Sequence, residues 1–187
     1  MAKALLVLDM QEVTVGKDHA KFFSYPEDIL AKVNSVIEQN ECNLIVYIRN
    51  LMKNNFINKL APVKCFAGTQ EAELAEGLLM KSEYIFDKYK GDAFSVPAFA
   101  AFLKEKSVDE VEIIGVDGGG CVSLTALGAC TAGYRVRLNT AAIGTMFTAK
   151  RDKYYAKLKA LGAEIVGDLD IPMIPVYFTD KQEKTGK

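Results

Sequence analysis

The segment from Val111 to Ala132 constrains the fold of this chain more than any other stretch. Val111–Val116 is a short apolar run with several β-branched residues, which predicts a buried strand. Asp117 and three glycines interrupt the run with residues typical of turns. From Cys121 onwards, small and apolar residues recur at helical spacing. The segment therefore predicts a strand, a tight turn and a helix over Cys121–Ala132.

The position of Cys121 favours a reactive thiol. The first turn of a helix has unpaired N–H groups and the positive end of the helix dipole, which stabilise an anion. We therefore expect a lowered pKa for the Cys121 thiol and a larger thiolate fraction. The alternative is that Cys121 is a small buried core residue, as most free cysteines are.

The four cysteines predict free thiols rather than disulfides. Cys42, Cys65, Cys121 and Cys130 are irregularly spaced and include no C-x-x-C pair. On one helix, Cys121 and Cys130 would lie about 13 Å apart, which is too far for a disulfide. We therefore expect a reducing, cytoplasmic setting.

The composition excludes several classes of protein. Of 187 residues, half are hydrophobic, which predicts a single domain over residues 1–187, with residues 172–187 as a tail. With 23 basic and 24 acidic residues and no block of like charges, we expect neither a nucleic-acid partner nor a membrane-surface partner. The single histidine, His19, argues against a metal site, and we expect no cofactor. The apolar N-terminus is interrupted by Asp9 and predicts a strand rather than a signal peptide.

Expected strands and helices alternate along the chain. The expected strands are Ala4–Leu8, Asn43–Arg49, Glu83–Asp87, Val111–Val116, Tyr134–Asn139 and Glu164–Val166. The expected helices are Ile29–Gln39, with a capping box at Ser24 and Glu27, then Glu71–Leu79, Pro97–Lys106, Cys121–Ala132 and Ala149–Leu161. Residues 10–23 are expected to be a loop, and residues 50–68 a loop with a short helix. This order predicts an α/β fold, namely a single Rossmann-like three-layer αβα domain with a six-stranded, mostly parallel sheet.

Three chemically capable residues follow expected strands. Asp9 follows the first strand, Lys88 the third and Cys121 the fourth. Because ligands of such sheets bind beyond the C-terminal strand ends, we expect these side chains at one edge. Taken one at a time, each residue also has a purely structural explanation. Asp9 would be a turn residue, Lys88 a surface lysine and Cys121 a core cysteine. Together they favour a functional site.

Four sequence pieces resemble the isochorismatase-like family of cysteine hydrolases, and its amidase branch in particular. They are LLVLDMQ (Leu5–Gln11), GTQEAEL (Gly68–Leu74), KYKGDAF (Lys88–Phe94) and GVDGGGCVSLTALGA (Gly115–Ala129). They occur in family order and, with the strands between them, cover most of the chain to about residue 161. The last piece is the most specific.

The resemblance implies a catalytic set of Asp9, Lys88 and Cys121. Lys88 is chosen over Lys90 because it stands four residues before Asp92, which is the family's spacing. The implied activity is that of a metal-free cysteine hydrolase, which cleaves the C–N bond of a small amide, ureido or carbamoyl compound through a thioester. The implied partners are that small-molecule substrate and further copies of the chain, in a dimer or larger homo-oligomer.

The resemblance also implies an oxyanion hole. A non-proline cis peptide between Val116 and Asp117 would turn the Asp117 N–H towards the same point as the Cys121 N–H. Phe94 and Tyr89 are candidates for the wall of the substrate pocket, or alternatively for the core.

Several alternatives remain open or are disfavoured. The glycine run 118–120 is unusual for the family and either opens the pocket or loosens the turn. A nicotinamidase is disfavoured because that branch holds a metal with an Asp and several His residues. The isochorismate-cleaving branch lacks the cysteine.

The different-class alternative is a catalytically silent binding or scaffold protein that keeps Asp9, Lys88 and Cys121 by descent. A nucleotide site is not supported, since the glycine run is not G-x-G-x-x-G, and a thiol-redox role lacks a nearby resolving cysteine.

Overall fold

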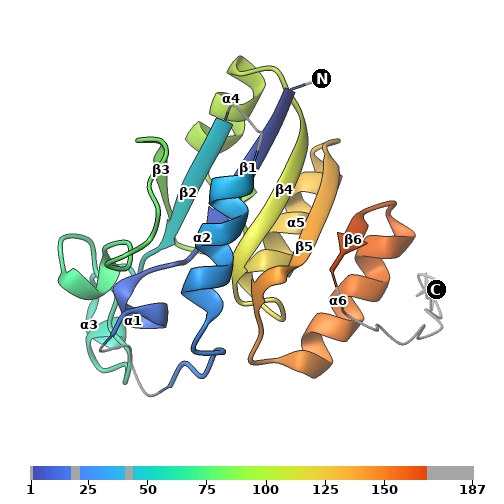
Figure 1. Cartoon of the computed structure of the whole chain (residues 1–187). Coiled ribbons are helices and arrows are strands. Elements are labelled where there is room, and N and C mark those ends of the chain that lie inside the picture. Colours follow the sequence, from blue (N-terminus) through green and yellow to red (C-terminus); the bar gives the residue numbers. More distant parts are fainter. Residues whose placement is uncertain (1, 18–21, 41–43, 168–187) are drawn as a thin grey trace, which may run out of the picture.

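A six-stranded sheet organises the chain (Figure 1), which a computed structural model describes over residues 2–17, 22–40 and 44–167. The strands are β1 (Ala2–Leu8), β2 (Leu44–Asn50), β3 (Ile85–Lys88), β4 (Val108–Val116), β5 (Arg135–Gly144) and β6 (Glu164–Val166). Their order is β3-β2-β1-β4-β5-β6, and every pairing is parallel. The predicted α/β class is confirmed, with a sheet that is entirely parallel. The predicted tail, 172–187, lies outside the described residues, as do His19 and Cys42.

Helices cover both faces of the sheet and produce three layers. They are α1 (Glu12–Val15), α2 (Ile29–Gln39), α3 (Phe56–Lys59), α4 (Pro97–Glu105), α5 (Cys121–Thr131) and α6 (Thr148–Ala160), with short 3-10 turns η1 (Gln70–Ala72) and η2 (Ala93–Ser95). Helix α2 packs on one face, while α4, α5 and α6 pack on the other (Figure 1). None of the helices in the described ranges is long and apolar enough to cross a membrane.

The burial of the central strand β1 on both faces explains its apolar sequence. Leu5 and Val7 belong to the core cluster under α2, while Leu6 and Leu8 belong to the cluster under α4, α5 and α6. All four side chains are fully buried. A strand covered on both faces needs a continuous apolar run rather than an alternating one, which is what the sequence has.

The predicted helix over Glu71–Leu79 is wrong. Only the 3-10 turn Gln70–Ala72 forms there, and the following backbone bonds to the loop after β1. The Ala75 N–H donates to the Met10 carbonyl at 2.9 Å, and the Glu12 N–H donates to the Glu73 carbonyl at 2.9 Å. Long-range pairing therefore uses the backbone groups that a helix would need.

The boundaries of several other elements also differ from the prediction. Helix α2 begins at Ile29 with Asp28 at its N-cap, so the predicted capping box at Ser24 and Glu27 does not form. Pro26 instead accepts the Ile29 N–H in a turn, at 3.0 Å. A short helix, α1, lies in the predicted loop 10–23. Strand β5 continues five residues beyond the expected end, to Gly144.

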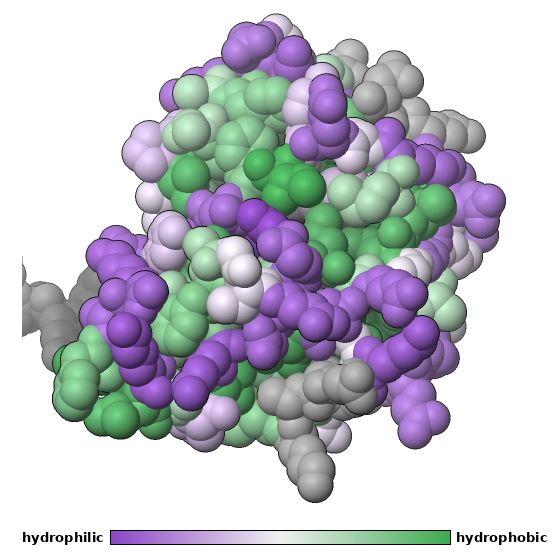
Figure 2. Space-filling model, turned by 90° about the vertical axis from the view of Figure 1, so that its left-hand side faces the viewer, coloured by the Kyte–Doolittle hydropathy of each residue, from purple (hydrophilic) through white to green (hydrophobic). Residues whose placement is uncertain are grey.

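Strand β3 and the segment before it leave apolar side chains at the sheet edge. Met80, Tyr84 and Ile85 are 43 %, 36 % and 40 % exposed. Figure 2 views this side of the molecule and shows hydrophobic areas between hydrophilic ones. Exposed apolar area of this kind suits contact with another protein surface. The predicted homo-oligomer stays a prediction.

Candidate active site

Asp9 directly follows β1 and has an unusual backbone conformation. Its φ is 56°, in the left-handed region that aspartate tolerates better than most residues. The Asp9 N–H donates to the Ile48 carbonyl at 2.8 Å, and the Thr14 hydroxyl donates to the Asp9 carbonyl at 2.6 Å. The backbone is thus held from both sides, which fixes the direction of a carboxylate that is almost fully buried.

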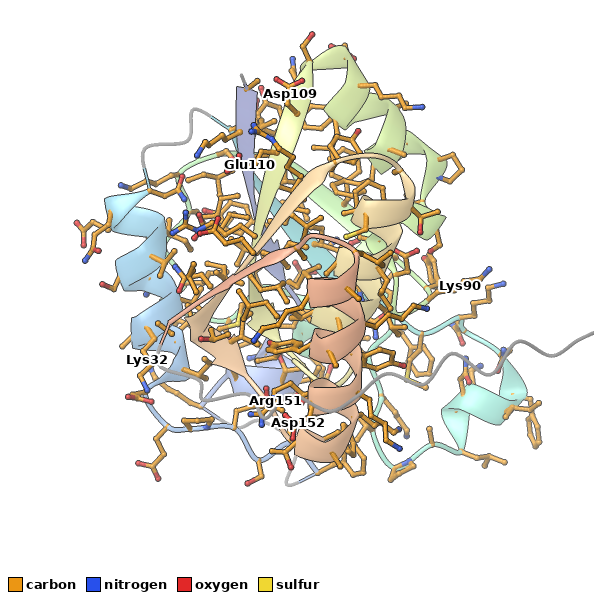
Figure 3. All side chains as sticks on the ribbon, turned by 90° about the vertical axis from the view of Figure 1, so that its right-hand side faces the viewer. Lys32, Lys90, Asp109, Glu110, Arg151 and Asp152 are labelled. Carbon is orange, nitrogen blue, oxygen red and sulfur yellow. The ribbon has the colours of Figure 1, made fainter. Side chains whose placement is uncertain are left out.

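Lys88, the last residue of β3, pairs with Asp9 inside the protein. Its side chain is 0 % exposed, and Nζ donates to Asp9 Oδ2 at 2.9 Å. Burial disfavours the charged ammonium, but the charges of Asp9 and Cys121 and hydrogen bonds to both outweigh it, so the pKa of Lys88 is raised. Lys90, by contrast, is exposed and points away from the molecule (Figure 3). The structure therefore brings Lys88, and not Lys90, next to Asp9.

The second oxygen of Asp9 is the unusual feature of this cluster. Asp9 Oδ1 is buried and has no hydrogen-bond partner among the described residues. A buried carboxylate oxygen without a partner is costly, and such groups are rare in native proteins. Cys121, whose thiol interacts with Asp9, supplies a proton that this oxygen could accept.

Cys121 is the first residue of α5, as the sequence predicts, but its predicted pKa shift is wrong. Burial raises the pKa of the thiol, and the negative charge of Asp9 raises it further. Lys88 acts in the opposite direction but does not compensate, and the pKa lies at about 12. Burial and Asp9 therefore outweigh the helix terminus. At neutral pH the resting thiol is protonated, with a carboxylate beside it.

Alkylation of Cys121 should accelerate steadily with pH. Below a pKa of about 12, the thiolate fraction rises about tenfold for each pH unit. We expect the iodoacetamide rate, followed by mass spectrometry of the Cys121 peptide, to rise across pH 7 to 10 without a plateau. A plateau below pH 8 would instead indicate the lowered pKa that the helix terminus alone predicts.

The turn between β4 and α5 presents two backbone donors near the thiol. The Val116–Asp117 peptide bond is cis, the bond at which the resemblance implies one. The N–H groups of Asp117 and Cys121 donate to no other group in the part of the chain that the structure describes. Both are thus available to a ligand oxygen.

Hydrogen bonds to the side chain of Asp117 stabilise this turn. Its Oδ1 accepts the Gly119 N–H at 2.7 Å, and its Oδ2 accepts the Met146 N–H from the loop after β5. Asp117 is only 8 % exposed. The carboxylate therefore ties the turn to a neighbouring loop.

The glycine run has a packing role that neither of the two predicted roles describes. A Cβ at Gly118 would lie 2.3 Å from Thr145 Oγ1, and one at Gly119 would lie 2.3 Å from the Phe147 carbonyl oxygen. A Cβ at Gly120 would make only ordinary contacts, the nearest at 3.6 Å. The first two glycines therefore allow the loop after β5 to pack directly on the turn.

The structure shows the surroundings of the two predicted pocket aromatics, Phe94 and Tyr89. The Phe94 ring packs against Phe99 and Tyr134, with centroids 5.2 and 5.5 Å away. It lines a groove of about 520 Å³ between α4 and α5, whose lining includes none of Asp9, Lys88 and Cys121. Tyr89 is 49 % exposed. A pocket role for Phe94 and Tyr89 stays a prediction.

Two side chains near the cluster were not identified from the sequence as site residues. Gln11 is buried and accepts the Asn50 N–H at 2.7 Å while donating to the Ala72 carbonyl at 2.9 Å. Its signal was a polar residue three positions after the end of an apolar strand. Tyr25 lies near Asp117 through packing that is distant in sequence, and no local pattern indicated it.

The described residues contain no group of three or more His, Cys, Asp or Glu side chains that could hold a metal ion. This finding covers the described residues alone, and Asp18, His19 and Cys42 lie outside them.

Comparisons with known proteins show the family and the fold of the chain. The model of the isochorismatase domain family matches residues 3–168. Among solved structures, PnC1 from L. infantum, in complex with nicotinate, has a TM-score of 0.77 at 23 % identity, covering 88 % of this chain and 92 % of that one. The pyrazinamidase of Pyrococcus horikoshii, in complex with zinc, has a TM-score of 0.74 at 26 % identity, covering 89 % and 99 %. N-carbamoylsarcosine amidase from Thermoplasma acidophilum has a TM-score of 0.73 at 22 % identity, covering 88 % and 95 %. No curated protein sequence matches the chain.

Proposed function

The chain belongs to the isochorismatase domain family, and from this premise we propose that it is a cysteine hydrolase that cleaves the C–N bond of a small amide, ureido or carbamoyl compound without a metal. One observation carries the proposal. The buried Lys88–Asp9 pair leaves Asp9 Oδ1 without a partner, and Asp9 interacts with the thiol of Cys121. A carboxylate held next to a nucleophile is the arrangement that nucleophilic catalysis requires.

In the proposed first step, the Cys121 sulfur attacks the substrate carbonyl carbon. An S–C bond forms, the thiol proton moves to Asp9, and the carbonyl oxygen becomes an oxyanion. The N–H groups of Asp117 and Cys121 receive that oxyanion, since they have no other acceptor among the described residues. Because the resting thiol has a raised pKa, proton transfer accompanies the attack rather than preceding it.

In the proposed second step, the tetrahedral intermediate collapses. The C–N bond breaks, and Asp9 returns the proton to the leaving nitrogen, so ammonia or an amine departs. Water then attacks the thioester, giving one proton to Asp9, which passes it to sulfur as the C–S bond breaks. Lys88 stays charged throughout because its pKa is raised, and it stabilises Asp9 as an anion.

The proposed substrate class is supported by the names of structural neighbours. One neighbour is named an N-carbamoylsarcosine amidase and another a pyrazinamidase in complex with zinc, and both share this fold. The sequence contains a single histidine, which favours a metal-free amidase over a metal-dependent nicotinamidase. A buried site with Asp9, Lys88 and Cys121 together also argues against a silent binding protein.

The proposal predicts ammonia release that a chelator does not reduce. Purified protein should be assayed on a panel of small primary amides, N-carbamoyl amino acids and nicotinamide, with and without EDTA. We expect turnover of at least one compound at the same rate in EDTA, and an acyl adduct on Cys121 in quenched samples by mass spectrometry. Turnover that EDTA abolishes would refute the metal-free mechanism. No turnover and no adduct across the panel would favour the binding protein.

A further inference from the structure

Asp9 lies on the face of the sheet that a continued strand would not give it. In β1, Val7 belongs to the core cluster under α2, and Leu8 belongs to the cluster under α4, α5 and α6. Because side chains alternate along a strand, a continued β1 would point Asp9 towards α2. Its carboxylate instead bonds to Lys88, which shares a face of β3 with Phe86, and Phe86 packs against the cluster under α4, α5 and α6. The backbone must therefore turn at Asp9 for the two charges to meet.

The left-handed conformation of Asp9 provides this turn. Its φ is 56°, whereas residues in parallel strands have a φ of about −120°. The next residue, Met10, is buried in the cluster under α2, so it occupies the face that Asp9 leaves. A left-handed conformation costs free energy in any residue with a Cβ, and it persists only where surrounding contacts hold it.

The same turn ends the hydrogen-bond ladder between β1 and β2. The Asp9 N–H still donates to the Ile48 carbonyl at 2.8 Å, as in a parallel ladder. The next bond of that ladder would run from the Asn50 N–H to the Asp9 carbonyl. The Asn50 N–H donates instead to Gln11 Oε1 at 2.7 Å. The Asp9 carbonyl therefore needs a donor from outside the sheet.

Thr14, in α1, supplies that donor. Its hydroxyl oxygen lies 2.6 Å from the Asp9 carbonyl oxygen and 2.9 Å from the Gln11 carbonyl oxygen. The Gln11 carbonyl already accepts the N–H groups of Thr14 and Val15, each at 3.0 Å, so we assign the single hydroxyl proton to Asp9. Thr14 Oγ1 also accepts the Gln11 N–H at 3.1 Å. One buried hydroxyl thus connects the turn at Asp9 to the first turn of α1.

We propose that Thr14 is a positioning residue that acts through Asp9: its hydroxyl holds the left-handed conformation that turns the Asp9 carboxylate away from α2 and towards Lys88. The carboxylate is thereby kept beside the thiol of Cys121. The role in turnover rests on the proposed function. The position of the carboxylate beside the thiol does not depend on any substrate.

The first test compares two substitutions of Thr14 in the amidase assay. Valine keeps the shape of the side chain and removes the hydroxyl, whereas serine keeps the hydroxyl. On any amide that the wild type hydrolyses, we expect Thr14→Val to lower kcat by about tenfold with KM unchanged, since one buried hydrogen bond is worth about a factor of ten. Thr14→Ser should keep kcat within about twofold of the wild type.

The second test is iodoacetamide alkylation of Cys121 at pH 8, which needs no substrate. The charge of Asp9 raises the pKa of the thiol and that of Lys88 lowers it, so a carboxylate that turns back towards α2 lets the pKa fall. We expect Thr14→Val to react about threefold faster than the wild type or more. In the Asp9→Asn/Lys88→Met background, which carries neither charge, Thr14→Val should change the rate by less than about twofold.

The matched control is Thr140→Val. Thr140 is also 8 % exposed, and its hydroxyl donates to the Val166 carbonyl at 2.7 Å, at the β5–β6 edge of the sheet. This substitution removes a comparable buried hydroxyl and should leave both readouts unchanged.

Three results would overturn the proposal: wild-type kcat in Thr14→Val, an equal loss of kcat in Thr14→Ser, or an equal acceleration of alkylation in both backgrounds. The last result would mean that the substitution loosens the structure in general. If Thr14→Val does not fold, Thr14→Ala and Thr14→Ser give the same comparison, because they differ only in the hydroxyl. If no amide is hydrolysed, the proposed function fails, while the alkylation rates still decide the role of Thr14.

Discussion

Replacing Cys121 by alanine is expected to lower kcat/KM by about 10³-fold or more, with ammonia release from the best amide as the measurement. The reason is that no other group in the cluster can form the thioester. Asp9 and Lys88 are paired with each other, and Cys65 is buried, with its thiol donating to the Asn50 carbonyl at 3.2 Å. Loss of the nucleophile removes covalent catalysis and leaves only the backbone donors and binding.

The matched control for this prediction is Cys130→Ala. Cys130 also lies on α5 and is also half-buried, but it packs at the margin of the core, and its pKa is raised chiefly by burial, with no contribution from Asp9 or Lys88. It should keep wild-type kcat/KM. Retention of activity in Cys121→Ala, with an unchanged circular dichroism spectrum, would show that the sulfur is not the nucleophile and would refute the proposed mechanism.

The local sequence pattern predicted those strand and helix boundaries that are set by residues adjacent in the sequence. The apolar run before Asp9 predicted β1 because a strand buried on both faces has no polar alternation. The turn residues before Cys121 predicted where α5 begins. From these strand ends alone, the sequence placed Asp9 and Lys88 at one edge, and the structure shows their side chains in contact.

Properties set by three-dimensional packing were not predicted. The segment after Gln70 has helical spacing, but its backbone pairs with the loop after β1 instead. The pKa of Cys121 was expected to fall because only the helix terminus was visible, whereas burial and Asp9 raise it to about 12. Tyr25 was missed because Gly144, which makes room for its ring, is far away in sequence.

The Lys88–Asp9 pair gives the second large prediction, which concerns stability as well as activity. Lys88→Met keeps much of the side-chain volume but leaves the Asp9 carboxylate buried without its cation. Breaking a buried pair in this way costs about 3–5 kcal/mol of unfolding free energy. For a chain of this length, that corresponds to a fall in Tm of roughly 6–20 °C, measured by thermal denaturation. Lys90→Met, at an exposed position, should stay within about 0.5 kcal/mol of the wild type.

A further variant separates the two roles of the pair. Asp9→Asn combined with Lys88→Met removes both charges, so it should recover much of the stability that Lys88→Met loses, because a neutral pair carries no unpaired buried charge. Activity should stay about 10³-fold or more below the wild type in both variants, since neither has a base for the Cys121 proton with a cation beside it. Full activity in the double variant would show that the pair serves folding alone. Recovery of stability without recovery of activity would mean that the protein keeps a costly buried ion pair for the sake of the thiol next to it.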